Sequence, residues 1–297
     1  MKQIQLSEQL SISAIVQGFW RLESWNWTAK ELADFMKACI KRGVTTFDTA
    51  QIYADTRCES LMGEAFSCDK SIRKQIRLVS KTGIFKEMID GKPFGYYNTT
   101  YERVMASCKE SLARLGTDYL DLYLIHREDP CLDPWETARA LKELKKEGLI
   151  REAGVSNFDP FKFEALNKAM GGEMVTNQIE WNPVCFEHFN SGMMDYLTGN
   201  RIHPMIWSPL AGGRLFKKED PLCEKAMKKI EEIAERHGED PATIIYAWQL
   251  YHPAGAAVLS GSRNLSRLDL AVRALDVKLA HHEWYEIYTA SGQQVIR

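Results

Sequence analysis

The sequence predicts an α/β protein folded as one (β/α)8 TIM barrel across residues 1–297, and three observations support this. Short apolar, β-branched runs alternate with longer amphipathic, charged runs, which is typical of parallel strands joined by helices. Eight such runs can be counted, the number that closes a parallel sheet into a barrel. No linker or low-complexity segment divides the chain.

The eight predicted strands are short, and most of them end in or beside a polar residue. In chain order they cover residues 16–20, 44–48, 76–81, 119–126, 150–156, 174–180, 203–208 and 256–261. Before them, residues 3–15 are predicted to form an N-terminal β-hairpin that closes the bottom of the barrel.

The segments between the strands carry helix signals. Residues 29–43 are amphipathic and end in glycine, while residues 133–148 begin with an Asp133 cap and a proline and also end in glycine. Further helical patterns near residues 240–252 and 281–292 predict extra helices near the C-terminus.

The composition excludes several classes of protein. A net charge of −2 provides no basic excess for nucleic acid or anionic lipid, and no stretch is long and apolar enough to span a membrane. The seven cysteines are odd in number and never spaced as CxxC, so we expect neither a disulfide framework nor a metal site. Reduced thiols and the absence of an apolar leader predict a cytoplasmic protein.

Four polar residues follow the ends of predicted strands: Asp48, Tyr53, Lys81 and His126. In a (β/α)8 barrel the carboxyl ends of the strands form the active site, so these side chains are expected to meet there. An ammonium beside a tyrosine stabilises the phenolate, and a carboxylate can hold that ammonium in place. The set is therefore equipped to protonate a carbonyl oxygen during its reduction.

Each of these residues also has an ordinary interpretation. Asp48 could cap a turn, Tyr53 could be a loop aromatic, Lys81 could be a solvated strand end, and His126 could belong to the core. A lysine at the end of an apolar strand is costly to bury without a partner, which favours an Asp48–Lys81 ion pair.

Seven motifs in the sequence resemble those of the aldo-keto reductase superfamily, in the same order. They are GVTTFDTAQIYAD, LVSKTG, DLYLIHRED, GVSNF, TNQIEWNP, WSPLAGG and GSRNLSR. The resemblance implies a (β/α)8 barrel, NADPH/NADP+ as the cofactor, and reversible reduction of aldehydes or ketones.

The same resemblance assigns roles to the four polar residues. Tyr53 is expected to be the general acid, and Lys81 to lower its pKa. Asp48 is expected to orient the lysine, and His126 to donate a hydrogen bond to the substrate carbonyl.

Cofactor residues are expected at the ends of later strands. Ser156, Asn157 and Gln178 resemble the set that binds the nicotinamide carboxamide, although the first two could instead cap a helix. Trp207 stands where the family usually has an aromatic that stacks on the nicotinamide. The following loop resembles the cover of the pyrophosphate, through Ser208, Pro209, Leu210, Gly212 and Arg214.

The segment GSRNLSR is expected to bind the 2′-phosphate of NADP. Ser262, Arg263 and Arg267 bring hydroxyl and guanidinium donors to a helix N-terminus, where anions are favoured. The alternative is a solvated helix face in which the arginines pair with acids such as Asp269. Gly261, also assigned to the cofactor site, stands where many family members carry lysine.

The substrate pocket is expected to be aromatic and open. Trp20, Trp25 and Trp27 could line it, although Trp25 and Trp27 could equally pack a loop onto the barrel rim. The only expected partner is a small carbonyl substrate, and we expect a monomer or a weak homo-oligomer. Two alternative functions remain: a nicotinamide-binding redox sensor, and a lyase or isomerase that uses Lys81 as a Schiff-base amine.

Overall fold

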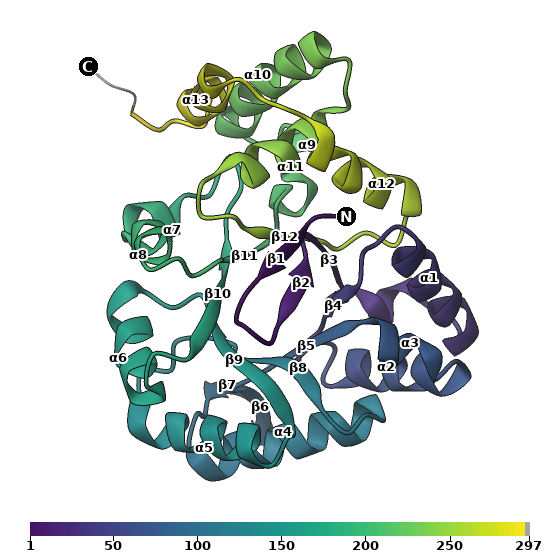
Figure 1. Ribbon diagram of the computed structural model, residues 1–297, viewed down its shortest axis with the longest axis vertical. Helices are drawn as coiled ribbons and strands as arrows, with labels where there is room; N and C mark the ends of the chain where they lie inside the picture. Colours follow the sequence, from purple (N-terminus) through teal and green to yellow (C-terminus); the bar gives the residue numbers. More distant parts are fainter. Residues whose placement is uncertain (295–297) are drawn as a thin grey trace.

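Eight parallel strands close into a barrel, which confirms the predicted fold (Figure 1). The structure is a computed structural model that describes residues 1–294 of the chain. Each predicted strand is present, and in chain order they are β3 (Ile15–Gly18), β4 (Thr46–Asp48), β5 (Arg77–Thr82), β8 (Leu120–Ile125), β9 (Ile150–Ser156), β10 (Met174–Glu180), β11 (Met205–Trp207) and β12 (Ala257–Ser260). Strand β12 pairs with β3 and so closes the ring.

The strand register places the polar strand ends together. In the pairing of β4 with β5, Asp48 lies opposite Val79. Because side chains alternate along a strand, Lys81, two residues beyond Val79, points to the same side as Asp48. His126 follows the end of β8, the next strand around the ring. The three residues are thereby brought to one end of the barrel.

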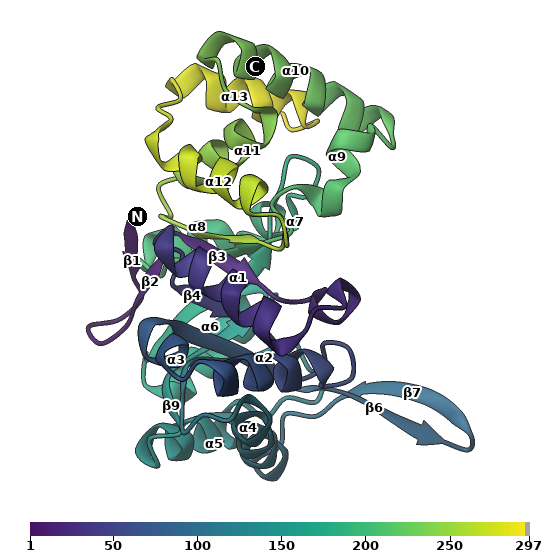
Figure 2. The ribbon, with the colours of Figure 1, turned by 90° about the vertical axis from the view of Figure 1, so that its right-hand side faces the viewer.

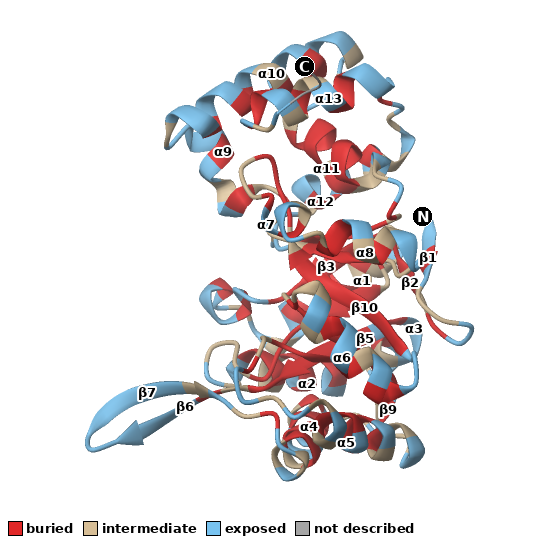
Figure 3. Cartoon of the chain, turned by 90° about the vertical axis from the view of Figure 1, so that its left-hand side faces the viewer, coloured by how far each residue is buried: buried red, intermediate tan, exposed pale blue. Residues whose placement is uncertain are grey.

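An outer ring of helices covers the strands, whose residues are mostly buried (Figure 3). The helices of the first six repeats are α1 (Ala29–Lys41), α2 (Arg57–Cys68), α3 (Ser71–Gln75), α4 (Tyr101–Leu115), α5 (Pro134–Lys146), α6 (Pro160–Met170), α7 (Glu187–Asn190) and α8 (Met193–Gly199). Those that follow are α9 (Arg214–Lys217), α10 (Pro221–His237), α11 (Pro241–Tyr251), α12 (Leu265–Arg273) and α13 (His281–Ala290), with single 3-10 turns η1 (Leu22–Trp25), η2 (Ala211–Gly213) and η3 (Ala274–Asp276).

Local sequence signals explain where the helices begin and end. The Asp133 carboxylate accepts hydrogen bonds from the backbone of Trp135 and Glu136, which confirms the predicted cap. Helix α1 begins with a capping box between Thr28 and Glu31. No helix in residues 1–294 combines the length and apolarity needed to cross a membrane.

The predicted N-terminal hairpin lies across one end of the barrel (Figure 1). It consists of β1 (Gln3–Gln5) and β2 (Ser11–Ser13). Ile4, Leu10 and Ile12 are buried, and they belong to one apolar cluster with inward residues of the barrel strands. This hairpin closes the amino end of the strands with hydrophobic contacts.

A second hairpin, which the sequence did not predict, projects from the opposite end of the barrel (Figure 2). It is built from β6 (Ile84–Ile89) and β7 (Lys92–Tyr97). The turn between them is Asp90-Gly91, and both residues have a positive φ. An Asp-Gly turn favours a tight hairpin, so the signal was present in the sequence.

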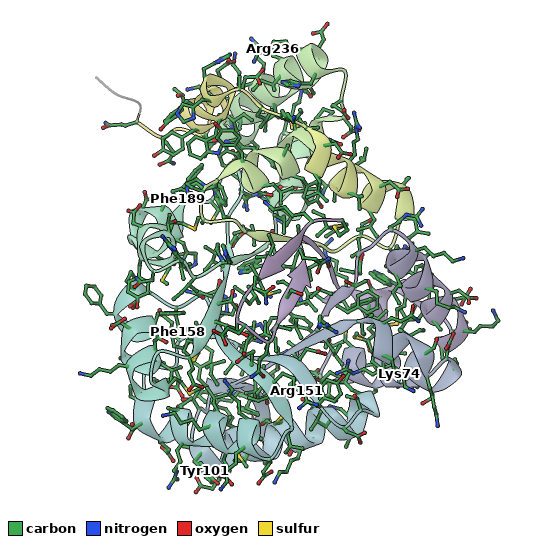
Figure 4. The ribbon with its side chains drawn as sticks, viewed as in Figure 1. Lys74, Tyr101, Arg151, Phe158, Phe189 and Arg236 are labelled. Carbon is green, nitrogen blue, oxygen red and sulfur yellow. The ribbon has the colours of Figure 1, made fainter. Side chains whose placement is uncertain are left out.

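Aromatic side chains hold together helices from the C-terminal part of the chain, on both sides of β12 in sequence. Trp248 and Trp284 each donate their indole N–H to the backbone carbonyl of the other, at 3.1 Å. Trp181, just after β10, packs against Trp248 with ring centroids 4.8 Å apart. Phe189, labelled in Figure 4, packs against Trp181 at 4.9 Å and extends the cluster to α7. The predicted helices near 240–252 and 281–292 correspond to α11 and α13.

Candidate active site

Three of the four predicted residues form a hydrogen-bonded chain at the carboxyl end of the barrel. The Lys81 Nζ donates to Asp48 Oδ1 at 2.6 Å, to the Thr49 carbonyl at 2.8 Å and to the Tyr53 hydroxyl at 3.3 Å. An ammonium has three N–H donors, so all of them are used. Because the phenol oxygen accepts from Lys81, its own proton is left for another acceptor.

The side chains of Lys81 and Asp48 are buried, which explains why their charges must be paired. Lys81 is 0% exposed and Asp48 is 2% exposed. Gln178 donates to the second Asp48 oxygen at 2.7 Å, so both carboxylate oxygens are hydrogen-bonded. A buried pair is tolerated only when its members are paired and satisfied in this way. The ion pair expected from the sequence is therefore present, and Gln178 supports it from β10.

Tyr53 reaches the pair because of an unusual turn. The three residues after it, Ala54, Asp55 and Thr56, all have positive φ values between 48° and 76°. None is glycine, so this left-handed path costs conformational energy. It connects Tyr53 to the beginning of α2, and the Tyr53 hydroxyl points back to the barrel interior.

The pKa values of Tyr53 and Lys81 reflect burial and the charges around them. Burial raises the pKa of Tyr53, and the neighbouring Lys81 charge opposes that rise without overcoming it. Lys81 thus acts on the phenol pKa in the expected direction, and burial is the larger influence. Burial alone lowers the pKa of Lys81, but Asp48 and Tyr53 outweigh it, so the net pKa is raised. At neutral pH the structure holds a protonated phenol beside an ammonium.

His126 completes the group. Its ring lies edge-on to Tyr53, with ring centroids 5.6 Å apart. Burial, and then the Lys81 and Arg127 charges, lower the pKa of His126 well below its usual range, so the imidazole is neutral. Its buried Nδ1 has no hydrogen-bond partner among the described residues. An unsatisfied buried nitrogen is unusual outside functional sites.

The predicted carboxamide residues are linked to one another. Ser156 Oγ donates to the Gln178 carbonyl at 2.8 Å and accepts from the Asn157 side chain at 2.7 Å. The Trp207 indole donates to Asn157 Oδ1 at 2.9 Å, so it holds the asparagine as well as lining the site. The Arg127 guanidinium lies over the Trp207 ring, 5.6 Å from its centroid, and covers one of its faces.

The predicted pyrophosphate loop has a strained backbone. Ser208, Ala211, Gly212 and Gly213 all have positive φ, although only two of them are glycine. The Ser208 carbonyl accepts from Asn182, and Pro209 accepts from Gln249 at 3.1 Å. Such strain is typical of functional loops that a surrounding framework holds in place.

Arg214 lies at the end of this loop. It forms long ion pairs with Glu219 at 3.9 Å and with Asp220 at 3.6 Å. Its guanidinium is thus partly committed to the loop itself. Leu210, four residues earlier in the same loop, is half-buried.

The arginines of GSRNLSR are not neutralised by the acid that the alternative invoked. Asp269 pairs with Arg42, which directly follows α1, at 2.5 Å. Neither Arg263 nor Arg267 forms an ion pair within residues 1–294. Both side chains are exposed at the start of α12, together with Gly261, while the Ser262 hydroxyl accepts from the Asn264 backbone. The Arg263 guanidinium donates one hydrogen bond, to the Trp25 carbonyl at 3.3 Å, so two guanidinium groups without a carboxylate partner among the described residues stand at this helix N-terminus.

The three tryptophans expected around the substrate occupy different environments. Trp25 is buried and packs against Phe19, Phe35 and Trp27, so it has the loop-packing role that the sequence left open. Trp27 lines a hollow of about 580 Å³ beside Arg263 instead of the space near His126. Trp20 is 62% exposed on the loop after β3 and stays a predicted pocket residue.

A second cavity, of about 300 Å³, is lined by the predicted residues Asn157 and Trp207, and by five residues that the sequence reasoning missed. Arg127, Glu128, Glu180 and Glu187 contribute charged groups to it, together with Tyr97 from the second hairpin. Arg127 and Glu128 directly follow His126 in the motif HREDP, and that position was the available signal.

The comparisons with known proteins agree with this geometry. The model of the Aldo/keto reductase family matches residues 14–291. Uncharacterized oxidoreductase YcsN of Bacillus subtilis is 38% identical over 98% of both chains, and 6-dehydroglucose reductase of Agrobacterium fabrum is 36% identical over 99% of this chain and 100% of the other. The crystal structure of an aldo/keto reductase from Klebsiella pneumoniae in complex with NADP and acetate is 27% identical, has a TM-score of 0.80, and covers 96% of this chain and 94% of that one.

Proposed function

The chain belongs to the aldo/keto reductase family, and from that premise we propose that it is an NADPH-dependent oxidoreductase that reduces aldehyde or ketone carbonyls to alcohols. The single observation that carries the proposal is the orientation of the Tyr53 hydroxyl. Its oxygen accepts a hydrogen bond from the fully engaged Lys81 ammonium, and its proton is available to a substrate.

Carbonyl reduction adds a hydride to carbon and a proton to oxygen. The nicotinamide of NADPH would supply the hydride and leave as NADP+. Tyr53 gives its proton to the developing alkoxide, and the Lys81 charge stabilises the phenolate that remains. Asp48 keeps the lysine charged and fixed at 2.6 Å. The raised pKa of Tyr53 keeps it protonated, as a general acid requires.

His126 is proposed to position the carbonyl. Its neutral ring carries one N–H and lies against the Tyr53 ring, so one substrate oxygen can accept from both residues. A neutral imidazole adds no second positive charge beside Lys81. This arrangement favours hydrogen bonding over proton donation by the histidine.

The residues around the site fit a phosphorylated dinucleotide. Arg263 and Arg267 form no ion pair within residues 1–294 and flank a helix N-terminus, which suits the 2′-phosphate. Beside them, the hollow lined by Trp27, Phe35 and Leu265 offers apolar walls for a base. Gln178 uses its amide nitrogen on Asp48, which leaves its amide oxygen to accept from a carboxamide.

The Schiff-base alternative loses support from the state of Lys81. A nucleophilic amine must be neutral, whereas the pKa of Lys81 is raised and all three donors are engaged. A redox sensor would use the same site without turnover, so only kinetics separate it from an enzyme.

The decisive experiment is a panel of small aldehydes and ketones with NADPH and with NADH, followed by the loss of absorbance of the reduced cofactor. We expect steady turnover of several carbonyls, with higher kcat/KM when NADPH is the cofactor. Oxidation of a single equivalent of bound NADPH would identify a sensor. No oxidation with any carbonyl would reject the proposed function.

A further inference from the structure

Gln249 on α11 is a fully buried amide that lies outside the catalytic group, with a side chain 0% exposed. Its Nε2 has two N–H donors, and both are used. One donates to the Trp181 carbonyl at 2.8 Å, and the other donates to the Pro209 carbonyl at 3.1 Å. The side chain therefore joins the segment after β10 to the loop after β11.

The oxygen of the same amide is less well satisfied. Gln249 Oε1 is buried and accepts no hydrogen bond from the residues that the structure describes. A buried acceptor without a donor costs free energy, so this amide stabilises the fold less than a fully paired one would. What the side chain provides is a pair of donors directed at two backbone carbonyls.

A second buried amide holds the carbonyl next to Pro209. Asn182, which is 1% exposed, donates from Nδ2 to the Ser208 carbonyl at 3.1 Å. Two successive loop carbonyls are thus bound by buried side chains. The loop needs such support, because Ser208 and Ala211 have φ values of 53° and 51° although neither is glycine. A backbone strained in this way persists only where the surrounding structure holds it.

The Pro209 carbonyl determines where the next backbone N–H points. The peptide that joins Pro209 to Leu210 is trans, and in a trans peptide the C=O and the N–H point in opposite directions. Because Gln249 holds the Pro209 oxygen on the buried side, the Leu210 N–H faces the other side. It donates no hydrogen bond within residues 1–294. If this peptide turned over, a carbonyl oxygen would face that side and would repel an anion.

We propose that Gln249 is a positioning residue for the dinucleotide: it fixes the peptide between Pro209 and Leu210 so that the Leu210 N–H is directed at the pyrophosphate. The inference rests on the proposed function, in which NADPH is the cofactor. Gln249 acts through the loop backbone and touches no part of the cofactor. A donor that is already oriented binds an anionic oxygen without first losing conformational freedom.

The variant Gln249→Met tests this role, because it keeps a similar volume and removes both donors. We expect the Kd of NADP+, measured by isothermal titration, to rise about tenfold. Stopped-flow fluorescence should show that most of this change is faster release. KM for NADPH should rise more than kcat falls, because Tyr53 and its partners are unchanged.

A ligand without a pyrophosphate separates the loop from the rest of the site. Adenosine 2′-monophosphate carries the base and the 2′-phosphate only, so its Kd should change by less than about twofold in Gln249→Met. An unchanged Kd for NADP+ overturns the inference. An equal loss for NADP+ and adenosine 2′-monophosphate also overturns it, because the effect would then not act through the pyrophosphate.

The matched control is Thr137→Val on α5. Thr137 is also 0% exposed, and its hydroxyl donates to the Thr99 carbonyl at 2.8 Å, so this variant removes a buried hydrogen bond of the same kind. NADP+ affinity should stay within about twofold. A tenfold loss in this control would mean that any buried defect weakens the cofactor, and that result overturns the role of Gln249.

Two further measurements keep the inference falsifiable. If urea unfolding shows that Gln249→Met does not fold, Asn182→Ala decides, because it frees the neighbouring Ser208 carbonyl: weaker NADP+ with unchanged adenosine 2′-monophosphate supports the inference, and an unchanged Kd for NADP+ overturns it. A wild type that reduces carbonyls while Gln249→Met binds NADP+ equally well overturns the inference alone. A wild type that binds neither NADP+ nor NADPH overturns the proposed function and this inference with it.

Discussion

The two ends of the barrel are built from the same eight strands but have opposite chemistry. At the amino end, Ile4, Leu10 and Ile12 of the first hairpin pack onto an apolar interior. At the carboxyl end, Lys81 and Asp48 are equally buried and form an ion pair. The first arrangement gains free energy by removing apolar surface from water, whereas the second must offset the cost of desolvating two charges. The apolar contacts at the amino end therefore stabilise the fold, and they offset part of the desolvation cost of the ion pair at the carboxyl end.

The two β-hairpins repeat this contrast. The hairpin β1–β2 buries its apolar residues against the barrel, whereas β6–β7 projects from the other end with Met88 and Phe94 more than half exposed (Figure 2). Only the base of β7 contributes to the cavity, through Tyr97. The first hairpin closes the amino end of the barrel, whereas the second leaves a cavity at the carboxyl end that a ligand can enter.

The largest expected effect is the loss of catalysis at the carboxyl end, with the amino end unchanged. Tyr53→Phe removes the proposed proton donor and keeps the ring that packs on His126. General acid catalysis contributes roughly 10²–10⁴ in rate, so kcat should fall by about that factor. NADPH affinity, measured by fluorescence titration, should stay within about twofold. A variant with wild-type kcat would remove Tyr53 from the mechanism.

The second prediction compares stability at the two ends. Lys81→Met leaves the Asp48 carboxylate buried without its cation, which should lower the free energy of unfolding by about 3–5 kcal/mol and abolish turnover. At the amino end, Ile12→Ala should cost about 2–5 kcal/mol and leave kcat unchanged. Urea unfolding and steady-state kinetics measure both effects.

A double variant sharpens this test. Asp48→Leu combined with Lys81→Met replaces the pair by apolar groups and should regain most of the lost stability without any activity. If the single Lys81→Met variant unfolds at the same urea concentration as the wild type, leaving Asp48 buried without its cation has no measurable cost in stability, which contradicts the prediction.

Much of this contrast was readable in the sequence, because strand ends are marked by residue type. A lysine after LVS and an aspartate after TTF predict a pair only once the strands are known to be parallel neighbours. The barrel supplies that condition, and the 2.6 Å contact follows. The first hairpin was also predicted, because its apolar residues alternate along the chain and need a buried face.

The features that the sequence did not predict depend on three-dimensional context. The net pKa of Tyr53 reflects burial that no local pattern reveals, and the role of Trp25 depends on which rings surround it. The cavity lining combines Arg127, Glu180 and Tyr97 from three separate strand ends and loops. Such convergence becomes visible only when the strand order and register are known.

The third prediction concerns arginines at the two ends. Arg267→Met at the start of α12 should weaken NADPH binding about tenfold and leave NADH binding nearly unchanged, because only NADPH carries the 2′-phosphate. The matched control is Arg151→Met at the beginning of β9, labelled in Figure 4. Its guanidinium lies over the Tyr119 ring, 4.4 Å from the centroid. Isothermal titration with both cofactors measures the difference. Equal losses for NADPH and NADH would assign Arg267 a structural role instead.

The smallest expected effect is a pH dependence that originates at the carboxyl end. Burial holds the pKa of His126 well below 6.5 in the folded protein, so at acidic pH the unfolded chain binds one more proton there. The stabilising contribution is present above about pH 6.5 and is lost as the pH falls towards the folded pKa, by at most about 1.4 kcal/mol per pH unit.

His126→Asn isolates this contribution. Two other histidines, His188 and His252, also have lowered pKa values, the latter to about 4, and they remain in both proteins. Urea unfolding between pH 5 and 7 should therefore show a shallower loss of stability in the variant than in the wild type, with the curves parallel above pH 7. Identical slopes would mean that His126 is solvated and charges freely, and an imidazole in that state could not serve as the neutral hydrogen-bond donor proposed beside Tyr53.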